Sequence, residues 1–125
     1  MSDSGILNLK DKMRIIQEIV PGKQITIAHI IANPDLVLYQ KLGLSPNLDY
    51  SKSAIGVVTI SPAETSIIIA DIATKASGAE IGFVDRFSGT LIVTGTVSEV
   101  EAALVALCDY ARNVLGFTVC DISKT

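Results

Sequence analysis

Side chains that could carry out chemistry are few in this 125-residue sequence. The chain has a single histidine, His29, and strand alternation places it in a row with three isoleucines. This setting favours a packed or interface residue over a general base or a metal ligand. The two cysteines, Cys108 and Cys120, lack Cys-x-x-Cys spacing and a neighbouring base, so we expect reduced, buried thiols. These residues predict neither a nucleophile nor a metal site.

Motifs of the well-known enzyme classes are missing from the sequence as well. It contains no His-Glu-x-x-His, no Gly-x-Ser-x-Gly, no Walker loop and no Gly-x-Gly-x-x-Gly. The carboxylates Asp71, Glu80 and Asp85 fall on three different predicted elements, where solvated or interfacial roles are the ordinary ones. We therefore expect a protein that is not an enzyme, with no catalytic residues, no cofactor and no metal.

Asp71 and Lys75 lie four residues apart near the end of a predicted apolar helix. One interpretation is a helix-stabilising ion pair worth about 0.3–0.5 kcal/mol. The other is that Lys75, close to the helix end, reaches the carbonyl or carboxylate groups of a neighbouring subunit. The spacing is compatible with both.

A second polar segment, directly after Asp85, has the composition of a tight hairpin turn between two strands. In the simpler interpretation its charges flank the turn. In the alternative, six copies arranged around an axis line a narrow channel with backbone N–H groups, Ser88 and Arg86. The residues of this turn are Arg86, Phe87, Ser88, Gly89 and Thr90.

Hydrophobic patterning predicts the elements that must position these residues. Residues 13–20 are compatible with either a strand or a helix and end at a Pro-Gly turn. Residues 24–32 alternate in the manner of a strand. One face of that strand is expected to carry Ile25, Ile27, His29 and Ile31.

A helix is predicted next. Asn33 is expected to cap it, with Pro34 at its first position, and Gly43 is placed to end it after Leu42. Residues 45–53 are expected to form a polar connecting loop.

The middle of the chain predicts a buried strand followed by a second helix. Residues 54–60 are almost continuously apolar, which is typical of a strand buried on both faces. The sequence Ser61-Pro62-Ala63-Glu64 has the pattern of a capping box. We expect a helix from there to about Ala76, ended by Gly78.

The last part of the chain predicts a hairpin, a long helix and a final strand. Residues 79–87 and 90–97 are expected to form the two strands of the hairpin. Ser98-Glu99-Val100-Glu101 has the pattern of another capping box, and residues 117–122 follow the helix as a strand. The apolar stripe of this helix consists of Val100, Leu104, Leu107 and Ala111.

The predicted order is β-β-α-β-α-β-β-α-β when residues 13–20 are counted as a strand. The βαββα unit over residues 54–113 indicates a split βαβ, ferredoxin-like α+β domain rather than a doubly wound sheet. A fold of this class leaves enzymes, regulatory sensors and assembly modules all open.

Composition excludes several classes of protein. Hydrophobic residues make up 49% and charged residues 18%, with a net charge of −3, which disfavours disorder and a basic nucleic-acid-binding surface. No apolar run approaches the ~20 residues of a membrane-spanning helix, and no signal peptide is evident, so we expect a cytoplasmic protein with no membrane or nucleic-acid partner. Residues 54–100 carry only seven charged side chains, which predicts spare apolar surface and self-association.

Five segments of the chain carry a family pattern, namely residues 53–57, 70–76, 80–85, 88–89 and 93–97. Together they resemble the bacterial microcompartment shell domain. Residues 16–34 and 80–89 are similar, more specifically, to the circularly permuted branch of that family, which includes shell proteins of ethanolamine and propanediol utilisation. The resemblance covers about residues 13–125.

The resemblance implies a circularly permuted shell domain over residues 24–125, in which the last strand and helix of the ordinary domain come first. Residues 1–23 then form an N-terminal extension. This extension resembles that of family members in which one strand from each of six subunits forms a small β-barrel over the pore. The barrel caps or gates the pore. The residues of this barrel strand are Met13, Arg14, Ile15, Ile16, Gln17, Glu18, Ile19 and Val20.

The family also implies a role and partners. A structural, cyclic homohexamer with a central pore packs as a tile with other shell proteins around encapsulated enzymes, in a compartment within the cytoplasm. Lys75, preceded by Asp71, resembles the lysine used in tile-to-tile contacts. The turn from Arg86 to Thr90 resembles the pore-side turn.

Two departures and one competing interpretation stand beside the resemblance. The sequence Ile31-Ala32-Asn33-Pro34 replaces a Pro-Arg-Pro-type edge motif, and the loop 45–53 is long. An oligomeric, ferredoxin-like domain that senses a small molecule is the alternative function, and a minor enzyme at a subunit interface is a third, against which the missing acid–base residues argue. Ethanolamine, propanediol and choline utilisation are all compatible with the sequence.

Overall fold

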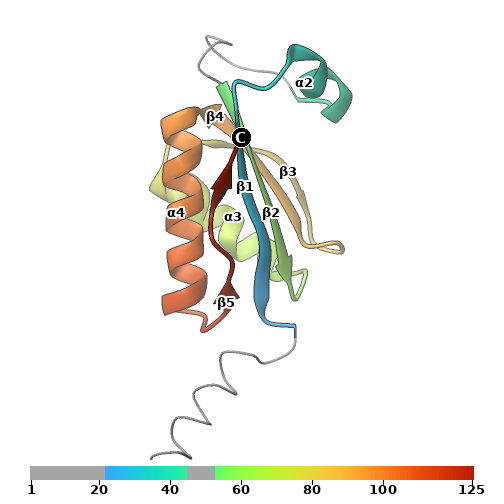
Figure 1. The fold of residues 1–125 in the computed structure, drawn as a ribbon. Coiled ribbons are helices and arrows are strands. Elements are labelled where there is room, and N and C mark those ends of the chain that lie inside the picture. Colours follow the sequence, from blue (N-terminus) through green and yellow to red (C-terminus); the bar gives the residue numbers. More distant parts are fainter. Residues whose placement is uncertain (1–21, 45–52) are drawn as a thin grey trace, which may run out of the picture.

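The computed structural model describes residues 22–44 and 53–125 (Figure 1). The predicted barrel strand over residues 13–20, and most of the predicted loop 45–53, lie outside these described residues. The elements in chain order are β1 (Gln24–Ala32), α2 (Leu36–Leu42), β2 (Ser53–Ser61), α3 (Thr65–Ala76), β3 (Glu80–Asp85), β4 (Thr90–Thr96), α4 (Val97–Asn113), β5 (Thr118–Val119) and β6 (Ser123–Lys124).

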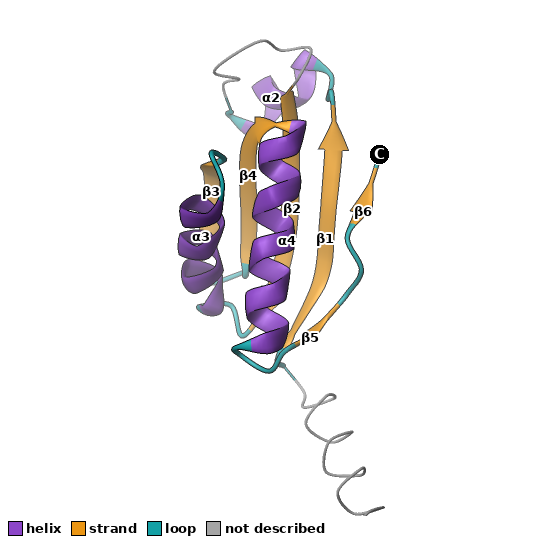
Figure 2. Ribbon diagram, turned by 90° about the vertical axis from the view of Figure 1, so that its left-hand side faces the viewer, coloured by secondary structure: helices purple, strands orange, loops and turns teal. Residues whose placement is uncertain are grey.

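The described strands form one sheet in the order β3-β4-β2-β1-β5, with β6 also pairing with β1. The pairs β1–β2, β2–β4 and β3–β4 are antiparallel, whereas β5 and β6 run parallel to β1. Helices α3 and α4 cover one face of the sheet, and α2 lies at one end of it (Figure 2). The predicted α+β class with its βαββα unit is confirmed.

The core lies between the sheet and the two longer helices. The predicted apolar stripe of α4, from Val100 to Ala111, is fully buried. Gly56 on β2 faces this stripe, and a Cβ atom there would lie 2.8 Å from side-chain atoms of Val100 and Leu104. Glycine therefore allows α4 to approach the sheet closely. Each buried Val or Leu side chain of this stripe stabilises the fold by about 1.5–3 kcal/mol.

A bulge in β1 changes which side chains share a face. The register against β2 shifts between Ile25 and Ile27. Ile25 is buried together with Ala28 and Ile30, whereas Ile27 is exposed and His29 half-buried. The prediction that Ile25 shares a face with Ile27, His29 and Ile31 is therefore wrong, because the extra residue of a bulge reverses the alternation beyond it.

The cap of α2 is Asp35 rather than the predicted Asn33. The Oδ1 atom of Asp35 accepts a hydrogen bond from the backbone N–H of Val37, at 3.0 Å. Asn33 has a φ of 51° and precedes the helix. Gly43 ends the helix as predicted, in the left-handed region with a φ of 72°, and its N–H bonds to the last turn.

Helix α3 begins later than predicted, at Thr65. Ser61 is the last residue of β2, paired with Gln24, so its side chain does not cap the helix. Glu64 occupies the N-cap position and makes no side-chain capping bond. The predicted capping box at residues 61–64 is therefore wrong, whereas the predicted end at Ala76 is confirmed.

The capping box of α4 exists two residues earlier than predicted. The N–H of Glu99 donates to Oγ1 of Thr96 at 3.2 Å, and the N–H of Thr96 donates to Oε1 of Glu99 at 2.9 Å. The prediction placed the box at residues 98–101. Since both segments carry the same pattern, the position at which β4 leaves the sheet decides between them.

Within the predicted strand 117–122 only Thr118–Val119 forms a strand, β5, and a second short strand, β6, follows at Ser123–Lys124. β5 pairs at Gln24 and β6 pairs at His29, and the unpaired gap between them lies opposite the bulge of β1. The bulge thus interrupts the parallel ladder. The His29 ring lies between two hydroxyl groups of this C-terminal segment, with Nδ1 2.6 Å from Oγ of Ser123 and Nε2 3.0 Å from Oγ1 of Thr125.

Candidate functional site

The turn between β3 and β4 is closed by its own backbone and by one carboxylate. Asp85 ends β3 opposite Thr90, and its carbonyl oxygen accepts a bond of 2.9 Å from the N–H of Gly89. Its Oδ1 atom accepts a second bond of 2.9 Å from the N–H of Phe87. Hydrogen bonds from the Phe87 N–H and from Ser88 hold the pKa of the Asp85 carboxyl below its usual value. Asp85 therefore fixes the turn in its ionised form.

Ser88 completes this internal network. Its Oγ atom lies 3.1 Å from Oγ1 of Thr90 and accepts a bond from the N–H of Thr90 at 3.3 Å. The backbone N–H groups of Phe87, Gly89 and Thr90 are thus bonded inside the turn. Asp85 and Ser88 accept these bonds, and the interpretation that six such turns line a channel stays a prediction.

The side chains that the turn presents outward are Arg86 and Phe87. The Cζ atom of Arg86 lies over the Phe87 ring, 4.7 Å from its centre. This distance is within the range of a cation–π contact. The Phe87 side chain is 80% exposed, the highest value among the large hydrophobic residues of the described chain.

Gly89 fixes the turn against the rest of the sheet. Its carbonyl oxygen accepts a bond of 2.9 Å from the N–H of Ile60, at the end of β2. Gly89 has a φ of 79°, and a Cβ atom there would collide with the Ile60 carbonyl oxygen. Both the backbone conformation and the close approach therefore require glycine. On the helix side, Oγ of Ser66 lies 3.4 Å from the carbonyl oxygen of Asp85.

The predicted pair on α3 is present. Nζ of Lys75 lies 2.8 Å from Oδ2 of Asp71, and the two side chains are 73% and 55% exposed. Hydrogen bonding to Asp71, and then its negative charge, raise the pKa of Lys75. The ion-pair interpretation is confirmed, and a contact between Lys75 and a neighbouring subunit stays a prediction.

The two thiols are free. Burial raises the pKa of the Cys108 thiol to about 11 and also raises that of the half-buried Cys120. Both groups are therefore protonated and weakly nucleophilic at neutral pH. Over residues 22–44 and 53–125 no group of three or more His, Cys, Asp and Glu side chains could hold a metal ion.

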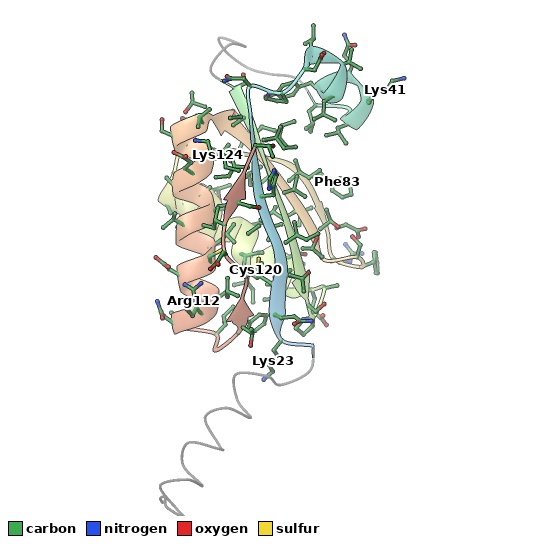
Figure 3. The ribbon with its side chains drawn as sticks, in the orientation of Figure 1. Lys23, Lys41, Phe83, Arg112, Cys120 and Lys124 are labelled. Atoms are coloured by element: carbon green, nitrogen blue, oxygen red, sulfur yellow. The ribbon has the colours of Figure 1, made fainter. Side chains whose placement is uncertain are left out.

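Large apolar side chains are exposed on several parts of the described surface, among them α2, α3 and the open face of the sheet. The low charge of residues 54–100 predicted spare apolar surface but did not indicate where it lies. Phe83 of β3 lies on the side of the sheet away from α4 (Figure 3). The exposed residues of these surfaces are Leu36, Val37 and Leu42 on α2, Ile67 and Ile68 on α3, and Ile27 and Phe83 on the open face of the sheet.

None of the described helices is both long and apolar enough to cross a membrane.

Comparison with known proteins identifies relatives along most of the chain. The family model of the BMC domain matches residues 54–122. The chain is 52% identical over 112 residues to the bacterial microcompartment shell protein PduU of Salmonella typhimurium, covering 90% of this chain and 93% of that protein. It is 45% identical over 115 residues to the shell protein EutS of Escherichia coli, covering 92% and 99%.

A solved structure agrees with these relatives. The flat hexamer form 1 of CutR superposes on this chain with a TM-score of 0.77 at 45% identity, covering 88% of this chain and 97% of that one. The domain model matches more than half of the chain, and the two relatives align over nearly their whole length. The chain belongs to the BMC-domain family and is a bacterial microcompartment shell protein.

Proposed function

We propose that six copies of this chain form a shell tile with a central pore. The observation that carries this proposal is the exposed apolar surface on α2, α3 and the open sheet face, in a chain similar to the CutR flat hexamer. Exposed large apolar side chains on several elements are typical of a surface that another subunit covers. A cyclic hexamer covers them with one head-to-tail interface repeated six times.

The turn from Arg86 to Thr90 is proposed to lie at the pore of this tile. A pore-side element has to keep one shape in every copy. Internal bonds from Asp85 and Ser88, together with the bond between Ile60 and Gly89, support such a role because they hold the turn without any contribution from a partner.

Residues 13–20 are proposed to cap this pore as a barrel of six strands. In their sequence Arg14 and Glu18 share one side of an alternating pattern, opposite Met13, Ile15 and Ile19. Six strands closed around an axis leave no free edge, and oppositely charged side chains can pair between neighbouring copies.

A circularly permuted domain order is part of the same proposal. The family match begins at residue 54, yet β1, which precedes that residue, lies inside the sheet between β2 and β5. An interior strand supplied from outside the matched segment is expected when the order of elements has been permuted. The boundary is then near residue 24, with an extension over residues 1–23.

Lys75 is proposed to form contacts between the edges of adjoining tiles. This residue is in the last turn of α3, and its ammonium group is exposed while Asp71 orients it. Such a group can donate to carbonyl or carboxylate oxygens of an adjoining tile.

The proposed partners are further copies of this chain, other shell proteins and the enzymes enclosed by the shell. The sensor interpretation is not favoured, since PduU and EutS are both shell proteins.

Light scattering of the purified full chain tests the tile. We expect a mass six times that of one chain across micromolar concentrations, and six-fold particles by electron microscopy. The double variant Ile67→Glu/Ile68→Glu should form smaller species, because charged groups on an apolar interface are unfavourable. Val114→Glu, at an exposed position beyond α4, is the matched control and should remain hexameric. A wild-type chain that stays monomeric would contradict the proposal.

A further inference from the structure

The C-terminal segment, residues 118–125, is attached to the sheet through β1. Its two strands have two residues each, and both pair with β1. No side chain of the segment is fully buried. Its side-chain bonds, to His29 and to Glu101, lie at the exposed surface. A segment with short strands and exposed bonds opens more readily than the buried strand β2, so an additional link would slow its opening.

Cys120 lies within this segment, between β5 and β6. Its backbone N–H donates to the carbonyl oxygen of Ile25 at 3.1 Å. The Cys120 side chain is half-buried and packs against the hydrophobic core. Cys108, on α4, is part of the same core and is 2% exposed. The two thiols therefore approach one core from two elements, α4 and the C-terminal segment.

The chain between the two cysteines turns back alongside the end of α4. The N–H of Phe117 donates to the carbonyl oxygen of Ala111 at 2.9 Å, and Ala111 lies within one helical turn of Cys108. β5 begins at the next residue and lies beside the last turns of α4 (Figure 2). This path carries Cys120 back toward Cys108.

The charges around the two thiols indicate the same proximity. Burial is the main cause that raises the pKa of each thiol. For the pKa of Cys108 the next cause is the negative charge that an ionised Cys120 would carry. The Arg112 guanidinium, one turn beyond Cys108 on α4, acts against burial on the pKa of both thiols. Since the energy between charges falls with distance, both thiols lie near each other and near Arg112.

We propose that Cys108 and Cys120 form a disulfide bond when the chain meets a small disulfide, and that this bond ties the C-terminal segment to α4. The Cys120 thiolate attacks one sulfur of the small disulfide and releases one thiolate. The Cys108 thiolate then attacks the sulfur of Cys120 and releases the second. The two protons of the protein thiols pass to the released thiolates, so one disulfide is reduced as the other forms. This redox-sensitive link belongs to one chain and does not depend on assembly into a tile.

Refolding of the full chain from urea in glutathione buffers tests this bond, because both thiols are accessible in the unfolded chain. As the proportion of glutathione disulfide rises, mass spectrometry should show the loss of two hydrogen atoms without a glutathione adduct. In the oxidised chain the amide hydrogens of Thr118 and Cys120, which bond to Lys23 and Ile25, should exchange at least about tenfold more slowly. The amide of Thr125, beyond the cross-link, should change less.

Two variants separate the intramolecular bond from general thiol reactivity. Cys120→Ser and Cys108→Ala each leave one thiol. Each variant should keep its hydrogen atoms or gain one glutathione, and the exchange of its Thr118 amide should not slow. A variant that slows as the oxidised wild type does would show that the bond is not the cause, and would overturn the proposal.

The wild-type chain itself can contradict the proposal in three ways. Two free thiols in every buffer, or glutathione on both cysteines, would show that the thiols do not reach each other. A disulfide between two chains, seen by non-reducing gel electrophoresis, would show that the cysteines pair outside the fold. An intramolecular bond that leaves the exchange of Thr118 and Cys120 unchanged would show that it does not fix the C-terminal segment.

Discussion

The carboxylate of Asp85 lies 2.9 Å from the backbone nitrogen of Phe87, and this bond closes the turn that presents Arg86. One side chain thereby decides which groups of the turn face outward. Its Oδ1 atom accepts the N–H of Phe87 and its carbonyl oxygen accepts the N–H of Gly89, while the guanidinium of the next residue, Arg86, contacts the Phe87 ring.

The Asp85 bond predicts a titration that can be observed directly. Its folded-state pKa is lowered, so the stability it contributes is present above the ordinary value of 3.8 and is lost as the pH falls through the lower folded value. The amide resonance of Phe87 should shift with a midpoint below 3.8 in a nuclear magnetic resonance titration. Asp85→Asn should remove this transition. A midpoint at or above 3.8 would show that the bond is not formed in solution.

Gly89→Ala should destabilise the folded chain by about 1–3 kcal/mol, because it places a side chain at a φ of 79° and against the Ile60 carbonyl oxygen. Urea unfolding measures the change. Gly116→Ala is the matched control, with a φ of 73° and no atom within 4 Å of the added Cβ. The control should lose only about 1 kcal/mol. Equal losses for the two variants would mean that the close approach at Gly89 contributes nothing.

Lys75→Ala should weaken the assembly of tiles into sheets while the hexamer and its melting temperature are nearly unchanged. Within one chain the pair with Asp71 is exposed on both sides and screened by solvent, so the fold does not depend on it. Sedimentation of sheets and electron microscopy measure assembly. Arg112→Ala removes a comparable exposed, acid-paired cation from α4 and serves as the control. If Lys75→Ala tiles assemble as well as wild-type tiles, Lys75 serves only to stabilise its own helix and makes no contact between tiles.

Deletion of residues 1–20 should leave a folded hexamer with an uncovered turn. Residues 22–44 and 53–125 form a core among themselves, to which β1 contributes Ile25, Ala28 and Ile30. Light scattering should give a mass six times that of the shortened chain, and Arg86→Cys in this background should react faster with a charged thiol reagent than in the full chain. Loss of the hexamer on deletion would place the extension in the subunit interface instead of over the pore.

The buried thiol of Cys108 predicts a loss of stability at high pH. Its pKa is raised to about 11 in the folded chain, from 9.0. The unfolded chain therefore releases this proton first, so the free energy of unfolding should fall by up to about 2–3 kcal/mol as the pH rises from 9 to 11. Cys108→Ala should show a shallower decline between these pH values in urea unfolding. Identical slopes would exclude Cys108 as the source.

Sequence patterns anticipated the elements better than their exact beginnings. The sequence predicted the order of strands and helices from β1 to α4, the α4 stripe and the hairpin turn. These features were predictable because residues that are buried on one face of a helix or strand recur at a regular spacing. The caps at Asp35 and Thr96 were not, since Ser, Thr, Asn and Asp occur at several adjacent positions that could each cap a helix. Only the point where a strand leaves the sheet selects one of them.

The sequence by itself determined that the chain is an α+β domain with spare apolar surface and without an enzyme motif, since composition and periodicity depend on residue type alone. Tertiary structure decided the bulge of β1, the division of the C-terminal strand into β5 and β6, and the inward hydrogen bonds of Asp85. The bulge and the division of the strand depend on which strands pair with β1, and the bonds of Asp85 depend on which polar side chain reaches the N–H of Phe87. Such choices follow from three-dimensional register and geometry, which no local spacing of residues encodes.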